Sequence, residues 1–427
     1  MTTFIQAFTK RPKNFKALFL LAISLLFFSC AKGETRLVLK TNNIEFISCA
    51  ELFNASQDKI KVVVHYQDEL VKNLAQGKDA EVPDLLAGSC LQAGIEKKVF
   101  ARLDSLIKEK GPLDKNAFYP ALLQTGRAGE KQYLLPVSFN LPAMVFYSGN
   151  YERLKDAAML SFEDIKSLSK KFNAQARDGS FTAMGFGPLW SQDFLYLVFK
   201  DMGVFYNVSQ DSIAYTENVF AKSADYVRDW IAQVNGGAKN EQDFAFKYLY
   251  MPFYKQVQSG RCLFSYASSR QILSLSKDQI QDLDFRWICN QNKIQIEDDL
   301  VSVGIYSKSK NKAAAKKFIL WLMSEFSQKQ MLDRKVQMNL ATDSFGIAGG
   351  FSALQNVTER LFPLYYRALL SNTPLADRLA APQNFPSDWA KIKAAVVEPF
   401  ILDSVSGNSK AATLADRYAA LLASESK

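Results

Sequence analysis

Short apolar runs rich in β-branched residues alternate with helical patterns over the first ninety residues, and this alternation limits the fold more than any other feature. Three runs indicate buried strands: Arg36–Leu39, Ile60–His65 and Pro83–Gly88. The spacing of Phe46, Ala50 and Phe53 predicts a helix after the first strand, and Leu70 and Leu74 predict one after the second that ends near Gly77. Such a β-α-β-α-β start is typical of an α/β fold with a parallel sheet.

Two prolines mark a stiff, extended passage in the middle of the chain. Pro136 and Pro142 lie six residues apart, between the strand-like segments Gln132–Leu135 and Ala143–Tyr147. Proline restricts its own φ and biases the preceding residue to extended geometry, so the passage is not expected to be helical. It suits a crossover between two lobes.

The alternation continues to the C-terminus. We expect helices at 161–172 and 194–202, and strands at Arg261–Tyr266 and Phe285–Cys289. A long buried helix is predicted from one apolar face, and further helices are predicted around Ile392 and over Ala411–Ala423. That apolar face consists of Ala315, Phe318, Ile319, Leu322 and Phe326.

The first thirty residues have the layout of an export signal. Four basic residues precede the apolar run Ala17–Phe28, and no acidic residue occurs before Cys30. The run is too short to cross a bilayer, so residues 1–29 are expected to be a signal peptide that is removed. Ser29-Cys30 resembles the lipobox of bacterial lipoproteins, which implies a diacylated Cys30. An ordinary secretory peptide cleaved nearby is the alternative.

The charge balance argues against a nucleic-acid partner. The chain has 52 Lys and Arg against 43 Asp and Glu. Removal of the leader takes four basic residues and leaves a net charge of +5. The basic cluster at 308–317 lies where a helix is expected to begin, and it indicates a solvated helix start.

Few residues are available for catalysis or metal binding. His65 is the only histidine, and no Asp/Glu cluster has metal-loop spacing, so we expect no catalytic residue, no metal and no cofactor. The adjacent Asp298 and Asp299 should point to opposite faces of an extended strand, unlike a glycosidase pair. The four cysteines after Cys30 allow one or two disulfides, although some of them could be core thiols, and for Cys49 the two interpretations are equally good. The four are Cys49, Cys90, Cys262 and Cys289.

Four stretches, taken in order, resemble the extracellular solute-binding proteins of ABC importers, the sugar-type group that includes maltose-binding protein. Each stretch is short, and their shared order along residues 34–427 carries the likeness. They are Val82–Leu86, Tyr133–Ser138 with Val145–Tyr147, Phe253–Ser269, and Ser307–Lys312 with Ala314–Ile319 and Leu322.

The resemblance implies a two-lobed periplasmic-binding-protein fold with several crossover strands and a ligand in the cleft between the lobes. Lobe one would comprise 34–138 plus 290–340, and lobe two 141–285 plus 343–427. The protein would be a monomeric, lipid-anchored binder, not an enzyme, on the periplasmic or cell-surface side of a bacterial membrane. Its partners would be a small solute, expected to be a saccharide, and the transmembrane subunits of an ABC permease.

Ligands of open α/β sheets bind at the carboxyl ends of strands, so polar residues just after the expected strands are the candidates in lobe one. Amide and carboxylate groups pair well with sugar hydroxyls. Asn42 and Asn43 could instead cap the following helix. The candidates are Asn42, Asn43, Glu45, Gly88, Ser89 and Gln92.

The remaining candidates lie at the crossover and in lobe two. Asn140 is the expected polar contact beside the hinge. Trp190 follows Gly187-Pro188 and could cover a sugar ring, although it could equally be a core residue. Tyr266, Ser268 and Ser269 follow a strand, and the next residue, Arg270, is interpreted as a solvated helix start that could pair with an anion.

Departures from the family pattern bear on the ligand. Ala267-Ser268-Ser269 stands where the family commonly has a glycine with an aromatic residue, and Gly88 stands where maltodextrin binders often place an aromatic. These differences disfavour a long maltodextrin. Adjacent Tyr365 and Tyr366 resemble an iron-binding pair, but helix packing explains them better. A non-sugar solute (a polyamine, an organic acid or a phosphorylated compound) and a surface lipoprotein without a transport role are the alternatives.

Overall fold

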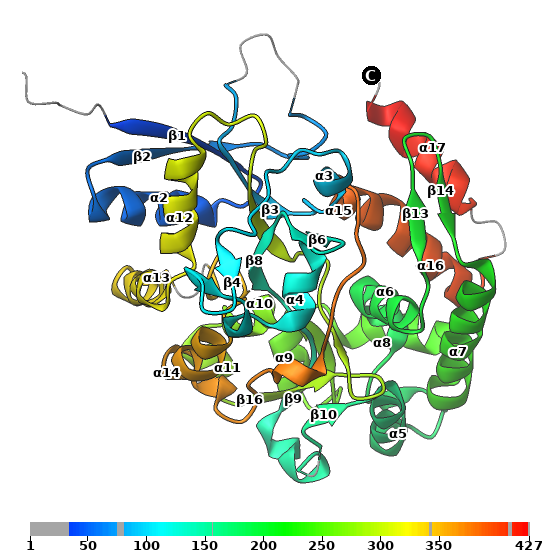
Figure 1. The fold of residues 1–427 in the computed structure, drawn as a ribbon. Coiled ribbons are helices and arrows are strands. Elements are labelled where there is room, and N and C mark those ends of the chain that lie inside the picture. The colour runs from blue at the N-terminus through cyan, green and yellow to red at the C-terminus, as the bar shows by residue number, and fades with distance from the viewer. Residues whose placement is uncertain (1–33, 75–80, 156, 341–343, 409–411, 426–427) are drawn as a thin grey trace, which may run out of the picture.

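The computed structural model describes residues 34–74, 81–155, 157–340, 344–408 and 412–425. Two β-sheets lie at the centre of the molecule, with helices packed around them (Figure 1). The expected α/β class is confirmed. The expected signal peptide and Cys30 lie outside the described residues.

The first sheet has six strands in the order β19-β8-β18-β3-β1-β2. β1 pairs in parallel with both β2 and β3, whereas β18 and β19 join the sheet antiparallel. The three strands expected from the apolar runs at the start of the chain are therefore all present. The bounds are β1 Thr35–Thr41, β2 Ile60–Tyr66, β3 Leu85–Ser89, β8 Leu135–Phe139, β18 Val301–Ile305 and β19 Phe351–Ser352.

Helices α2 (Glu45–Ser56), α12 (Lys312–Leu322) and α13 (Glu325–Gln337) pack beside this sheet. Phe53 of α2 meets Phe318 of α12 edge to face, with ring centroids 5.1 Å apart. The helix expected after β2 is wrong for residues 67–74, which form turns. Glu69 has a φ of 49°, outside the helical region, while Leu70 is buried against the sheet without a helix.

The long helix predicted through Phe326 is two helices. α12 ends at Leu322, and Ser324 caps α13 by accepting the backbone N–H of Ser327. The break turns Phe326 outward, and its side chain is 72% exposed, so its predicted place on the buried face is wrong.

The second sheet has the strand order β10-β16-β9-β15. The strand predicted at Arg261–Tyr266 is displaced, because the N–H groups of Leu263 and Phe264 bond to the Gly185 carbonyl and not to a strand. α5 (Phe162–Phe172), α6 (Gln192–Asp201) and α7 (Glu217–Asn235) contribute to the core on one face of this sheet. The strand bounds are β9 Pro142–Tyr147, β10 Met159–Leu160, β15 Ser265–Ser268 and β16 Leu283–Ile288.

Strand β9 is buried on both faces, which accounts for its unbroken apolar sequence. Ala143 and Val145 belong to the core shared with the first sheet, whereas Met144 and Phe146 belong to the core beneath α5 to α7. This alternation follows from the two-residue period of a strand.

Two crossovers connect the sheets and contact each other. β8 leads into β9 through Asn140-Leu141, as the two prolines predicted, and residues 296–300 lead into β18. The Glu297 N–H donates to the Asn140 carbonyl at 3.0 Å. After β19 the chain continues to the C-terminal helices, several of whose residues join the second core. β19 itself lies in the first sheet, although the sequence placed 343–427 in lobe two; the lobe boundaries stay a prediction.

All four cysteines in the described residues are buried and free, so neither of the disulfides considered above is present. Burial raises the pKa of the Cys49 thiol to about 12. Among the described helices, none has the length and apolar character needed to cross a membrane.

The remaining elements are short or lie at the periphery. In the first half of the chain they are α3 Ala93–Glu96, β4 Ile107–Lys108, β5 Leu113–Asp114, η1 Lys115–Ala117, α4 Pro120–Thr125, β6 Arg127–Ala128, β7 Lys131–Gln132, η2 Ser148–Arg153, β11 Ala174–Gln175, β12 Phe181–Ala183, η3 Pro188–Trp190, β13 Tyr206–Val208 and β14 Ile213–Tyr215. In the second half they are α8 Ala238–Tyr248, α9 Phe253–Gln258, α10 Ser269–Leu273, α11 Lys277–Ile280, β17 Ile294–Gln295, η4 Val357–Leu361, α14 Phe362–Tyr365, η5 Arg367–Leu369, η6 Ala376–Arg378, β20 Leu379–Ala380, α15 Trp389–Ile392, η7 Lys393–Val397, α16 Glu398–Ser406 and α17 Leu414–Glu425.

Candidate ligand-binding site

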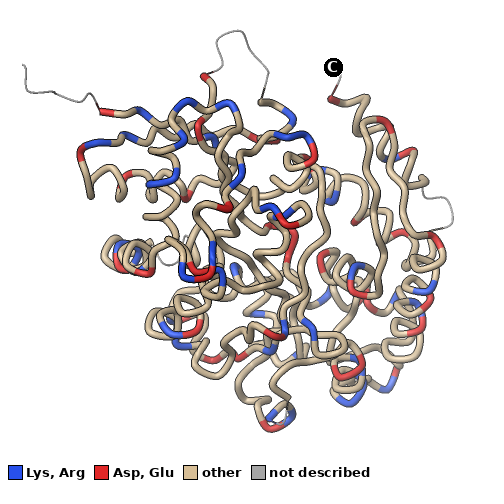
Figure 2. Tube along the Cα trace, viewed as in Figure 1, with Lys and Arg blue, Asp and Glu red and all other residues tan. Residues whose placement is uncertain are grey.

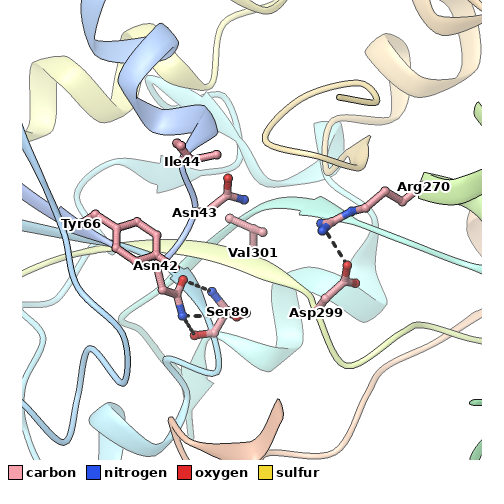
Figure 3. Close-up of a pocket in the computed structure, with 8 residues that line it drawn as sticks. All are labelled: Asn42, Asn43, Ile44, Tyr66, Ser89, Arg270, Asp299 and Val301. Atoms are coloured by element: carbon pink, nitrogen blue, oxygen red, sulfur yellow. Dashed lines mark hydrogen bonds and ion pairs between the residues drawn. The ribbon is translucent and has the colours of Figure 1, made fainter. Parts of the chain in front are cut away.

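A cavity of about 390 Å³ lies where the carboxyl ends of β1, β2 and β3 meet the crossover and the start of α10. This is the edge at which an open α/β sheet binds ligands. Most of its lining comes from strands of the first sheet and the segments beside them, and Arg270 comes from α10, which follows strand β15 of the second sheet (Figure 3). The lining residues are Asn42, Asn43, Ile44, Tyr66, Ser89, Arg270, Asp299 and Val301.

Asn42 and Ser89 hold two strand ends together on one side of the cavity. The Ser89 N–H donates to Asn42 Oδ1 at 3.1 Å, and Asn42 Nδ2 donates to Ser89 Oγ at 3.4 Å. A Cβ at Gly88 would overlap the Asn42 amide, so glycine is needed at that position for the two strand ends to approach.

Asn43 lies just before α2 and also lines the cavity. Its Oδ1 accepts the Glu45 N–H at the start of α2, at 3.0 Å, while its Nδ2 donates to the Ala348 carbonyl at 2.8 Å. The residue lines the cavity and ties the start of α2 to the loop before β19.

Arg270 and Asp299 form an ion pair across the opposite side of the cavity, with Nη2 and Oδ2 3.1 Å apart (Figure 3). Arg270 Nε also donates to the Gly349 carbonyl at 2.9 Å. Asn140 Nδ2 donates to Asp299 Oδ2 at 2.8 Å and, like Arg270, to the Gly349 carbonyl. Asp299 Oδ1 is itself buried and has no hydrogen-bond partner among the described residues.

Asn140 and Ser269 support this wall from behind. Ser269 Oγ donates to Asn140 Oδ1 at 2.7 Å and accepts the Leu141 N–H at 3.1 Å. Both side chains are almost fully buried. They therefore position Asp299 and the crossover and do not line the cavity themselves.

The other residues that the sequence proposed have partners elsewhere. Glu45 pairs with Lys335 at 2.9 Å, Ser268 caps α10, and Gln92 is buried at the start of α3. The Tyr266 hydroxyl donates to Glu297 at 2.8 Å. None of these side chains is among the residues that line the cavity.

Trp190 packs within the protein. Its ring stacks on Phe244 of α8 at 5.4 Å with an interplanar angle of 14°, and its indole N–H donates to the Glu241 carbonyl at 3.1 Å. Of the two interpretations that the sequence allowed, the core residue is the one that this geometry favours.

Tyr66, Arg270 and Asp299 were not among the proposed site residues. Tyr66 ends β2 and is 59% exposed, so the rule of strand ends that selected Asn42 could have selected it. Arg270 was interpreted as a solvated helix start. Asp299 was considered only as half of a carboxylate pair, and the two carboxylates do point apart. Asp298 pairs with Lys200 and Asp299 with Arg270.

The described residues contain no group of His, Cys, Asp and Glu that could hold a metal ion.

Comparison with known families identifies the scaffold. The family model described as bacterial extracellular solute-binding protein matches residues 44–329, well over half of the chain. The chain belongs to this family. No curated relative matches the sequence.

Solved structures share the fold at low sequence identity. The cyclic α-maltosyl-1,6-maltose-binding protein of Arthrobacter globiformis has a TM-score of 0.59 at 14% identity, over 91% of this chain and 99% of that one. An ABC substrate-binding protein of Listeria monocytogenes in complex with cycloalternan has a TM-score of 0.57 at 14% identity, over 92% and 99%. The galacto-N-biose/lacto-N-biose I-binding protein of Bifidobacterium longum has a TM-score of 0.57 at 14% identity, over 92% and 96%. The expected family and two-lobed fold are confirmed, and the family is one of substrate-binding proteins.

Proposed function

We propose that this chain is the substrate-binding lipoprotein of an ABC importer, which captures a sugar or small oligosaccharide as a monomer and delivers it to the membrane permease. It has no enzymatic role in this proposal. The observation that carries the choice of ligand is the chemistry of the cavity at the strand ends. Amide, hydroxyl and carboxylate groups converge there beside one exposed aromatic ring, Tyr66.

The charges of the cavity support a neutral ligand. Among the described residues that line the cavity, Arg270 is the one basic side chain, and Asp299 already neutralises it. A polyamine would need several carboxylates, and an anion would need an unpaired cation. The asparagine amides and the Ser89 hydroxyl instead suit hydroxyl groups, each of which can donate and accept.

A thermal-shift screen of sugars, polyamines and small anions tests the ligand class, followed by calorimetry on each hit. We expect a saccharide to raise the melting temperature and Asn42→Ala to weaken its binding. Asn207→Ala removes an exposed asparagine of β13 and serves as the matched control. Stabilisation by polyamines or anions alone would overturn the sugar assignment.

We further propose that ligand binding closes the two lobes about the crossovers near Phe139 and near Cys289. Binding between two bodies links the closed state to ligand occupancy. Small-angle scattering should show a smaller radius of gyration at saturation with a verified ligand. An unchanged radius would mean a rigid pocket.

The anchor is tested independently of the ligand. In the native host, globomycin should block processing of the wild-type chain, and the mature protein should partition into detergent. Both effects should disappear in Cys30→Ala. Wild-type protein released freely into the aqueous phase would overturn the lipid anchor and leave the ligand assignment intact.

A further inference from the structure

The end of the first sheet opposite the cavity carries a second distinctive surface. The cavity lies at the end where Val301 pairs with Ser89, and the opposite end is where Ile305 pairs with Leu85. Strands β1 and β2 begin at that opposite end, at Thr35 and Ile60. The length of β18 separates the two ends by roughly 15 Å.

Exposed lysines from three separate segments gather around this opposite end. The Thr35 N–H bonds to the Lys59 carbonyl, Asn311 Nδ2 donates to the Arg36 carbonyl, and Ser307 Oγ donates to the Lys98 carbonyl. These contacts bring the start of β2, the loop before α12 and the turn after α3 together. We call this surface the lysine edge, and its members are Lys59, Lys61, Lys97, Lys98, Lys308, Lys310 and Lys312.

The lysine edge keeps a positive excess. None of its members forms an ion pair with another described residue, and all are exposed. The nearby Arg36 pairs with Glu81, so these two charges cancel. Glu34, Asp58 and Glu96 are the exposed acids on the same segments, and the lysines outnumber them. Figure 2, viewed as in Figure 1, shows blue segments along the edge of the molecule where β1 begins, with fewer red ones.

The start of the described chain lies at this same end. Glu34 immediately precedes β1, and the expected lipidated Cys30 precedes Glu34 by four residues. Four residues span at most about 14 Å even when fully extended. A lipid on Cys30 would therefore hold this end close to the headgroups, within reach of electrostatic attraction at physiological salt.

We propose that the lysine edge lies against a leaflet that contains anionic phospholipid while the chain is tethered through Cys30. This inference rests on the lipid anchor of the proposed function. Lysines near an anionic surface are attracted to it, and seven on one edge would orient the tethered protein. The cavity would face away from the bilayer in this tethered state, so the lysine edge would have to leave the leaflet before the cavity meets the permease.

The test uses the unacylated chain from residue 31 onward, which contains every described residue. Its co-sedimentation with phosphatidylcholine vesicles is compared with that of mixed phosphatidylcholine and phosphatidylglycerol vesicles, at low and high salt. We expect binding to the mixed vesicles only, and weaker binding at high salt. Equal binding to both kinds of vesicle, or none to either, would overturn the proposal.

Two matched variants separate the edge from overall charge. K98Q/K308Q/K310Q/K312Q should weaken vesicle binding about tenfold or more. K170Q/K171Q/K222Q/K277Q removes the same charge at four exposed lysines that form no ion pair with a described residue and lie outside the lysine edge, and it should bind like the wild type. Replacing the four edge lysines with arginine should preserve binding.

Equal loss in both glutamine variants would reduce the effect to net charge and overturn the proposal, as would tighter binding to an acidic protein or polynucleotide than to vesicles. Ligand affinity measured on the same samples should be unchanged in every variant. A failure of the sugar assignment would therefore leave the vesicle result unaffected. A failure of vesicle binding would likewise leave the sugar assignment unaffected.

Discussion

Asp298 and Asp299 follow one another in the crossover that leads into β18, yet they lie in two unlike surroundings. Asp298 bonds to Lys200 Nζ at 2.5 Å, to the Tyr196 hydroxyl and to the Trp389 indole N–H. The Asp298 side chain is 8% exposed. Asp299 is 38% exposed, pairs with Arg270 beside the cavity, and keeps one oxygen without a partner.

The difference separates a structural carboxylate from one that is available to a ligand. Asp298 and Asp299 lie in a turn and not in the extended strand that the sequence predicted, and this turn directs the two acids into different environments. The Lys200 ammonium holds the pKa of Asp298 below its usual value even though burial opposes this. A buried carboxylate with a complete set of partners holds the crossover in place. Asp299 instead is partly exposed where it lines the cavity.

The largest expected effect comes from removing the buried carboxylate of Asp298. Asp298→Ala leaves the Lys200 ammonium buried without its counter-charge, and this typically costs about 3–5 kcal/mol of folding free energy. Denaturant unfolding measures the loss. A change below about 1 kcal/mol would contradict the structural role. Asp298→Asn should recover part of the loss because it keeps an acceptor for Tyr196.

Two aromatic residues sharpen the same contrast. Trp190→Ala should lower the free energy of unfolding by about 3 kcal/mol without changing intrinsic affinity, because the ring packs on Phe244. Tyr66→Ala should leave stability nearly unchanged and weaken saccharide binding by about 1 kcal/mol. Denaturant unfolding and calorimetry on both variants test this. Reduced affinity with unchanged stability in Trp190→Ala would return that residue to the site.

Glu297, the residue before Asp298, should make the free energy of unfolding depend on pH. Burial raises the pKa of Glu297 to about 7, with Lys393, Lys200 and the Tyr266 hydroxyl acting in the opposite direction. An unfolded glutamate titrates near 4.3. Between these values the folded state holds a proton that the unfolded state has lost, so stability falls as pH rises and is level above about 7.

Glu297→Gln should remove about 2 kcal/mol of the stability lost between pH 5 and pH 8. Denaturant midpoints measured across this range give the slope. Glu241 provides a second test, because burial also raises its pKa to about 7. Glu241→Gln should remove a similar part of the pH-dependent loss of stability. The same dependence of the midpoint on pH in wild type and in Glu297→Gln would contradict the raised pKa of Glu297.

A smaller effect than that of Asp298 is expected for Asp299, which lines the cavity. Asp299→Ala should weaken binding of the identified saccharide by about 1.5 kcal/mol, because a charged acceptor for a ligand hydroxyl is lost. Stability should change by less than 1 kcal/mol, since this side chain is partly exposed. Calorimetry with the ligand provides the affinity, and unfolding provides the control. A large stability loss with intact affinity would place Asp299 with Asp298.

The site could be predicted where it depends on strand ends and not where it depends on distant contacts. Asn42, Asn43 and Ser89 directly follow or end strands that the apolar pattern reveals, and all three line the cavity. Trp190 was ambiguous because its stacking partner, Phe244, lies in a helix more than fifty residues away. The sequence around Arg270 does not indicate a ligand contact. Its position at the cavity depends on its ion pair with Asp299 and its hydrogen bond to the Gly349 carbonyl.

The sequence by itself determined the α/β class, the parallel start of the first sheet and the extended crossover at its two prolines. These features follow from local periodicity and from backbone restrictions that each residue carries with it. Only the tertiary structure decided that residues 67–74 form turns, that Trp190 packs inward and that Asp299 faces a cavity. Those outcomes depend on which distant side chains the two crossovers bring together, and no local pattern encodes such convergence.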